Sequence, residues 1–403
     1  MGGYWERCGT ATQIDMPLYA RAVVFVRGAQ RCALVSLDLV ALSATVVDDI
    51  RRQIVDRTGM DEAAVMVCAS HTHSGPLTLD YRGMGAVDPI YIERIVRAVV
   101  QAVEKAASAL ESVHLHYARA GVDLGVNRRT EDGPVVPHAH VVWCESARGP
   151  LAILLQYACH PVVLGASNLC ISGDFVGAAA RHIEAATGAT ALYFNGACGD
   201  INPRLTQLDA GAVSLLGKEL ATATLGALAG AQQIEVHRLR WLQRRIDLPL
   251  RAPSGVRRQR LLQYGKWLWR STIKRADEGA RRAARARWEW ARDVANDGAP
   301  ATRSFALHGM AIGSLVFLGF EGEMFVRYQL DIEAHNPRVV CCGLANGCIG
   351  YVPTADEYAR GGYEIEEGYK VYPGTRGVGA ESEAMIRAAT DEVLAALGVG
   401  KTV

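Results

Sequence analysis

The sequence predicts an α/β fold in which a mixed β-sheet core is flanked by helices. Runs of β-branched and aliphatic residues alternate with stretches of helical periodicity along most of the chain. Half of the 403 residues are apolar, which allows a large buried core and excludes global disorder. Polar, glycine-rich loops directly follow several apolar runs, and α/β proteins usually bind ligands at such loops.

Local signals place the individual elements. Gly28 divides the first two strands, Ser43 caps a helix that stops before Gly59, and Asp88 caps a helix with Pro89 at its first position. The predicted strands are 22–27, 32–40, 65–70, 113–117, 141–144, 151–157, 189–194, 304–311, 315–320 and 339–344. The predicted helices are 43–57, 88–110, 174–187, 210–228, one from about 323, and 381–397.

The segment 237–292 differs in composition from the rest of the chain. It holds 17 Lys and Arg residues against four acids, and five of the seven tryptophans. We expect a helical insertion or lid at 237–300 within a single domain spanning 1–403, with the tryptophans packed on the body. The alternative is a surface that binds nucleic acid or an anionic membrane.

Composition also limits the class of protein. The formal charge of +1 argues against a uniformly basic nucleic-acid binder, and no run of 18 apolar residues predicts a membrane span. The first residues lack the apolar stretch of a signal peptide, so we predict a cytoplasmic protein. The ten cysteines show no C-x-x-C spacing, which favours buried free thiols. The sequence leaves open whether the chain forms a homo-oligomer.

Histidines stand where two predicted strands end. His71 and His73 follow the strand 65–70, and alternate residues of an extended chain point to one side, so the two imidazoles can converge. His160 ends the strand 151–157 and is followed by Pro161. A third loop, 194–203, again follows a strand and is rich in small residues. These loops predict one cleft that suits a metal and a proton-transfer partner.

The order of the motifs resembles the catalytic domain of the neutral, non-lysosomal ceramidases and their shorter bacterial relatives. The resemblance rests on the loops above and on these motifs: Met1-Gly2-Gly3-Tyr4, Leu18-Tyr19-Ala20-Arg21, Val35-Ser36-Leu37-Asp38, Val126-Asn127-Arg128, Cys159-His160-Pro161, Gly322-Glu323, Gly350-Tyr351-Val352 and Tyr363-Glu364. They extend over nearly the whole chain, and the resemblance rests on their number and order, because no single motif is decisive.

The resemblance implies a zinc-dependent hydrolase that cleaves an N-acyl amide, with one Zn²⁺ per chain. Carried over by motif, the implied ligands are His71, His160, Glu323 and Tyr351. The residues that match those around the scissile carbonyl are His73, Arg128 and Tyr363. The ceramidases have a serine where this chain has Asn202, so we expect direct attack on the carbonyl by zinc-bound water.

Several alternatives stay open. Without a secretory signal, a smaller soluble amide, ester or lactone suits the chain as well as ceramide does. Glu321 is an alternative to Glu323 as the carboxylate ligand. Arg129 is an alternative to Arg128 as the arginine near the scissile carbonyl. His138 and His140 are further possible donors to the metal.

Two other classes of function also remain open. One is a cysteine hydrolase that uses Cys198 as nucleophile, and the other is a non-enzymatic binder that uses the basic, Trp-rich segment.

Overall fold

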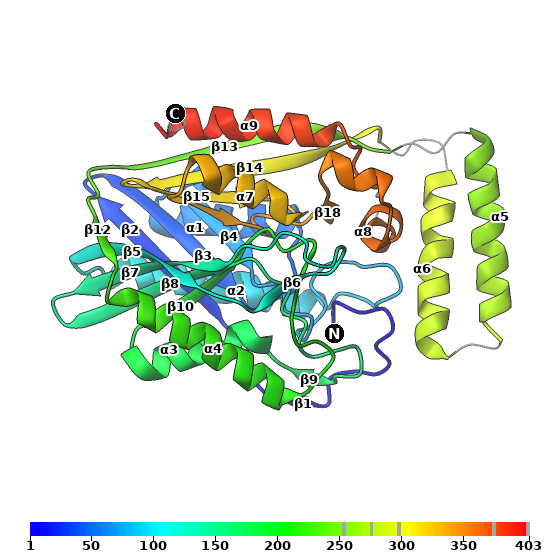
Figure 1. The fold of residues 1–403 in the computed structure, drawn as a ribbon, viewed down its shortest axis with the longest axis horizontal. Helices are drawn as coiled ribbons and strands as arrows, with labels where there is room; N and C mark the ends of the chain where they lie inside the picture. Colours follow the sequence, from blue (N-terminus) through cyan, green and yellow to red (C-terminus); the bar gives the residue numbers. More distant parts are fainter. Residues whose placement is uncertain (252–254, 275–276, 296–299, 373–375, 400–403) are drawn as a thin grey trace.

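Three β-sheets with helices on their outer faces form the body of the protein, which confirms the predicted α/β class (Figure 1). The computed structural model describes residues 1–251, 255–274, 277–295, 300–372 and 376–399, with the side chains of 255–258 left out. The polypeptide crosses between the sheets several times, so residues distant in sequence meet at their shared edge. None of the described helices is long and apolar enough to cross a membrane.

The sheets are mixed in strand direction. The five-stranded sheet has the order β10 (Thr190–Asn195), β8 (Gly149–Tyr157), β7 (His138–Ser146), β5 (Val113–Gly121) and β12 (Gln232–Ile234). The four-stranded sheet has the order β13 (Leu239–Pro249), β14 (Thr302–Ile312), β15 (Leu315–Phe320) and β17 (Val339–Cys342). The three-stranded sheet consists of β2 (Ala20–Arg27), β3 (Gln30–Leu37) and β4 (Val65–Ala69). Three short pairs are β1 (Gln13–Ile14) with β9 (Cys170–Ile171), β6 (Gly125–Asn127) with β11 (Ile201–Pro203), and β16 (Glu323–Met324) with β18 (Tyr351–Val352).

The helices cover the outer faces of these sheets. Helices α1 (Ala44–Thr58) and α2 (Pro89–Ser108) pack on the three-stranded sheet, and α3 (Asp174–Thr187) and α4 (Ala210–Leu228) on the five-stranded sheet. Helix α9 (Ser382–Ala396) packs on the four-stranded sheet, and α7 (Val326–His335) lies between two of the apolar clusters. The remaining helical elements are α5 (Gly255–Thr272), α6 (Glu278–Ala295), α8 (Tyr363–Glu366), η1 (Glu62–Ala64), η2 (Ala355–Ala359) and η3 (Gly368–Val371).

The local signals of the sequence account for most element boundaries. The Ser43 hydroxyl accepts a hydrogen bond from the Val46 amide at the start of α1, and Gly59 ends that helix with φ of 67°. Asp88 caps α2 with Pro89 at its first turn. The capping predictions for both helices are therefore confirmed.

One apolar cluster joins all three sheets. Leu34 and Met66 reach it from the three-stranded sheet, Leu154 from the five-stranded sheet, and Phe317 from the four-stranded sheet. Each of these side chains is at most 1% exposed. Because the sheets pack on one core, the loops at their ends are held at fixed positions relative to one another.

Two sequence predictions are corrected. The segment 237–300 does not begin as a helical insertion, because 239–249 is β13, which pairs with β14 along its whole length. Helices α5 and α6 follow only after that strand. The helix predicted from about Glu323 begins instead at Val326, whose amide donates to Asp200 Oδ1 at 2.7 Å, and Glu323 lies in β16. A cap supplied by a distant loop leaves no local signal in the sequence.

The shared core predicts that Leu154→Ala destabilises the protein strongly. Removing a fully buried leucine side chain costs about 2–5 kcal/mol of unfolding free energy, through lost burial and the cavity left behind. Leu215→Ala on α4 is the matched control, because Leu215 is 51% exposed and its change should stay within about 0.5 kcal/mol. Denaturant unfolding followed by circular dichroism measures both. Equal effects of the two substitutions would contradict the prediction.

Candidate metal and catalytic site

His71 is held in a conformation that directs one ring nitrogen inward. It follows β4 and has φ of 73°, a left-handed value that residues other than glycine adopt rarely. Its amide donates to the Leu39 carbonyl at 2.8 Å, and its Nδ1 lies 2.7 Å from the Val40 carbonyl. A carbonyl only accepts, so Nδ1 carries the proton and Nε2 keeps a lone pair in the neutral ring.

His160 is fixed in the same way from a second sheet. It follows β8 and is fully buried, and its Nδ1 lies 2.6 Å from the Cys198 carbonyl and 3.1 Å from the Ile201 carbonyl. Nδ1 therefore donates, and Nε2 keeps its lone pair. Burial, together with the nearby Arg128 guanidinium, lowers the pKa of His160 to about 4, so the ring is neutral near pH 7.

Glu323 faces both of these lone pairs. Its Oε2 lies 3.2 Å from His160 Nε2 and 3.4 Å from His71 Nε2, while the Tyr372 hydroxyl donates to Oε1. Burial alone would raise the pKa of Glu323, but the two histidines hold it well below its usual range. Two ring nitrogens and a carboxylate oxygen at these separations can share one cation.

The donor set fits a zinc ion. Two neutral imidazoles and a carboxylate are common zinc ligands, and atoms about 2.0–2.1 Å from a tetrahedral zinc lie about 3.3 Å from one another. The separations of 3.2 Å and 3.4 Å agree with that value. The nitrogen donors of His71, His73 and His160 all lie within 4.8 Å of one another.

His73 stands beside these ligands and is covered by the N-terminal segment. Its Nε2 lies 3.2 Å from His71 Nε2, and its Nδ1 is buried without a hydrogen-bond partner among the described residues. Gly3, with φ of 102°, lies so close that an added Cβ would be 2.5 Å from the His73 Cβ. The Tyr4 ring contacts His73 edge-on at 5.0 Å. The glycines of the first motif thus let the backbone pass directly over His73.

Tyr351 lies beside Glu323. The two residues are register partners in the parallel pair of β16 and β18. This pairing brings together two motifs that lie 28 positions apart in the sequence. The Tyr363 ring meets Tyr351 at 5.9 Å, and Tyr363 is 45% exposed at the edge of the site. The structure therefore places Tyr351 next to Glu323, and Tyr363 next to Tyr351.

Arg128 is buried next to Tyr351 and is held by several acceptors. Its Nη2 donates to the Gly199 carbonyl at 2.7 Å, its Nη1 to Asn202 Oδ1 at 3.3 Å, and its Nε lies 2.8 Å from Glu364 Oε1. Its guanidinium also lies 5.4 Å from the centre of the Tyr351 ring. Asn202 therefore helps to orient Arg128.

The neighbouring Arg129 has a different environment. It pairs with Glu357 at 2.9 Å and with Glu364, and it lies over the Phe325 ring. Of the two arginines, Arg128 is the one that contacts Tyr351.

Glu321 is separate from the two histidines. Its Oε2 accepts from the Ala306 amide at 2.9 Å, and burial raises its pKa to about 7. Glu323, and not Glu321, faces His71 and His160.

His138 and His140 belong to another cluster. Their Nε2 atoms lie 2.8 Å and 2.9 Å from Glu333, which also accepts from Arg119 at 3.3 Å and Gln329 at 2.6 Å. Four side chains thus provide hydrogen-bond partners for the Glu333 carboxylate. The structure therefore groups these histidines with Glu333 instead of with His71 and His160.

Two residues of the site were missed by sequence reasoning. Tyr372, which donates to Glu323, lies in a segment with no motif, so nothing local could have identified it. Glu364 joins Arg128 and Arg129, and its place directly after Tyr363 in a motif was a usable signal.

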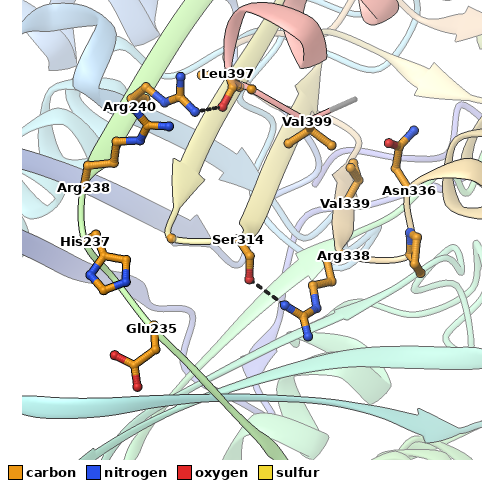
Figure 2. Close-up of a pocket in the computed structure, with 13 residues that line it drawn as sticks. Glu235, His237, Arg238, Arg240, Ser314, Asn336, Arg338, Val339, Leu397 and Val399 are labelled. Carbon is orange, nitrogen blue, oxygen red and sulfur yellow. Dashed lines mark hydrogen bonds between the residues drawn. The ribbon is translucent and has the colours of Figure 1, made fainter. Parts of the chain in front are cut away.

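A separate open pocket of about 520 Å³ lies between the start of β13, the turn from β14 to β15, and the end of α9 (Figure 2). Two of its three arginines already have acceptors. Arg240 donates to the Leu397 carbonyl, and Arg338 to the Ser314 hydroxyl at 2.8 Å. No predicted site residue lines this pocket, so the candidate site is the cluster around Glu323.

The fold is that of the neutral ceramidases, as the sequence resemblance predicts. A neutral ceramidase from Pseudomonas aeruginosa is similar with a TM-score of 0.76 and 20% identity, over 98% of this chain and 70% of that chain. A ceramidase complexed with C2 is similar with the same TM-score and identity, over 98% and 72%. No protein-family model and no curated protein sequence matches the chain.

The environment of Cys198 predicts an unreactive thiol. The side chain is fully buried, and burial raises its pKa well above 9, so it stays protonated near neutral pH. Cys8 is exposed. Native protein treated with iodoacetamide should therefore be alkylated at Cys8 and not at Cys198, as measured by peptide mass spectrometry. Rapid labelling of Cys198 would revive the cysteine-hydrolase hypothesis.

Proposed function

We propose that the protein is a zinc-dependent hydrolase that cleaves an N-acyl amide. One observation carries the proposal: His71 Nε2 and His160 Nε2 converge on Glu323 Oε2, at 3.4 Å and 3.2 Å. Such an arrangement is stable when a cation lies among the three groups. The ceramidase fold, whose members act on amides, supports the same reaction class.

One zinc ion per chain would be held by His71, His160, Glu323 and Tyr351. When bound, zinc acidifies a water molecule and polarises a carbonyl oxygen, which makes hydrolysis feasible near neutral pH. The Tyr372 hydroxyl orients Glu323 by donating to the oxygen that faces away from His71 and His160.

Arg128 and Tyr363 would stabilise the charge that develops on the carbonyl oxygen. Arg128 is always charged, and its contacts with Gly199, Asn202 and Glu364 fix its position before substrate arrives. Tyr363 is exposed enough to reach a substrate and supplies a hydroxyl donor. A preorganised donor of this kind stabilises the transition state more than the bound substrate.

His73 would carry the proton to the leaving amine. Its Nε2 lies 3.2 Å from His71 Nε2, so the ring stands beside the proposed zinc ligands. Glu323 is a second group that can move a proton within the site. Because Asn202 cannot act as a nucleophile, no covalent acyl intermediate is expected at that position.

The experiment that tests the function is a hydrolysis screen with and without a chelator. Short-chain and long-chain N-acyl amides, ceramide included, should be compared with esters and lactones, because all present the same electrophilic carbonyl. We expect release of amine from at least one amide, lost on chelation and restored by zinc. Turnover of esters or lactones alone would replace the amide with one of those substrates, and turnover that survives chelation would exclude the zinc mechanism.

The site predicts that Glu323→Gln binds zinc at least about a hundredfold more weakly than the wild type, because it loses a charged ligand. Elemental analysis and competition with a chelator measure zinc content and affinity. Glu321→Gln is the matched control, since Glu321 is a buried glutamate two positions away that faces neither His71 nor His160. Zinc loss in both variants, or in neither, would contradict the assignment.

The oxyanion role predicts that Tyr363→Phe lowers kcat by on the order of 10²-fold and leaves KM nearly unchanged. Steady-state kinetics on the amide found in the screen measures both constants. Tyr19→Phe is the matched control, because Tyr19 is also 45% exposed and lies over Arg21 instead of at the site. A change confined to KM would remove Tyr363 from the oxyanion role.

A further inference from the structure

Helix α5 has an exposed aromatic pair on its outer face. Tyr264 and Trp267 are 56% and 61% exposed, and their rings lie 5.8 Å apart. They share one face of the helix because they are three residues apart. Figure 1 shows α6 next to the body and α5 outermost. On α5, Gly265 faces Ala291 of α6, and helical spacing places Trp267 on the opposite side of the helix. Such an exposed aromatic pair is a candidate interaction surface.

The charge on this helix is of one sign. Residues 255–274 include six Lys and Arg and no Asp or Glu. Arg260, Lys266, Arg270 and Lys274 are exposed, and in the part of the chain that the structure describes no ion pair involves them. Helical spacing places Arg260 and Lys274 in line with Trp267, and Arg270 and Lys266 to one side of it. Cations therefore lie above, below and along one side of the aromatic pair.

The hairpin is attached to the body near the candidate site. On α6, Arg287 pairs with Glu367 at 2.8 Å and lies 5.0 Å from the Trp5 ring. Asp293 pairs with Arg82 at 2.8 Å. Because α6 is fixed to three separate segments of the body, the outer face of α5 has a fixed direction relative to the site.

We propose that the exposed face of α5 docks on an anionic lipid bilayer. Trp and Tyr side chains partition into the headgroup region, and surrounding Lys and Arg are attracted by anionic lipids. A single strand of nucleic acid is usually bound in a groove, with bases stacked on separate aromatic rings. Helix α5 instead presents a convex face whose two rings contact each other. The proposal does not depend on the hydrolase activity.

Vesicle flotation with the full-length protein tests the proposal. We expect binding to vesicles of phosphatidylcholine mixed with phosphatidylglycerol, weak binding to phosphatidylcholine alone, and loss of binding as salt is raised. Lys266→Glu combined with Arg270→Glu should weaken binding at least about tenfold. Trp267→Ser should weaken binding without any change of charge.

The matched control is Arg27→Glu combined with Arg31→Glu. It makes the same change in charge at exposed positions on β2 and β3, and its vesicle binding should equal that of the wild type. Circular dichroism checks that all variants are folded. Equal weakening by the control pair, no preference for the anionic vesicles, or tighter binding of single-stranded RNA than of vesicles would each overturn the proposal.

Discussion

The candidate site depends on how the His71 and His160 rings are oriented. In both rings Nδ1 donates to a backbone carbonyl, so both Nε2 lone pairs face the Glu323 carboxylate. Three groups that can bind a metal are therefore directed at one point. The left-handed backbone of His71 and the close passage of Gly3 over His73 are local features that maintain this geometry.

The three sheets supply these groups from different parts of the chain. His71 follows a strand of the three-stranded sheet, His160 a strand of the five-stranded sheet, and Glu323 comes shortly after β15 of the four-stranded sheet. Since all three sheets pack on one apolar cluster, a rigid core sets the distances among the ligands. Asp200 adds to this rigidity, because its side chain caps α7 and its carbonyl accepts from the Arg128 amide.

The two proposals concern different faces of the same molecule. The site is surrounded by buried ion pairs, in which Glu364 holds both Arg128 and Arg129. The α5 face instead carries Lys and Arg side chains that form no ion pair with an Asp or Glu among the described residues. The hairpin still lies close to the site, because Arg287 on α6 pairs with Glu367 and contacts the Trp5 ring, which in turn contacts Tyr363. The basic, Trp-rich segment therefore divides into a strand of the core, a helix that packs on the body and a helix that faces outward.

The sequence by itself determined the α/β class, the strand ends that carry His71 and His160, and helix caps such as Ser43 and Asp88. These features depend on residues close together in the chain, through periodicity, capping and turn chemistry. The order of the motifs further identified Glu323, Tyr351, Arg128 and Tyr363 as candidate site residues. Only the tertiary structure decided that 239–249 is a core strand, that Glu323 and not Glu321 faces the histidines, and that Tyr372 supports Glu323. Each of those outcomes depends on a contact between residues far apart in sequence, and such a contact leaves no local pattern to interpret.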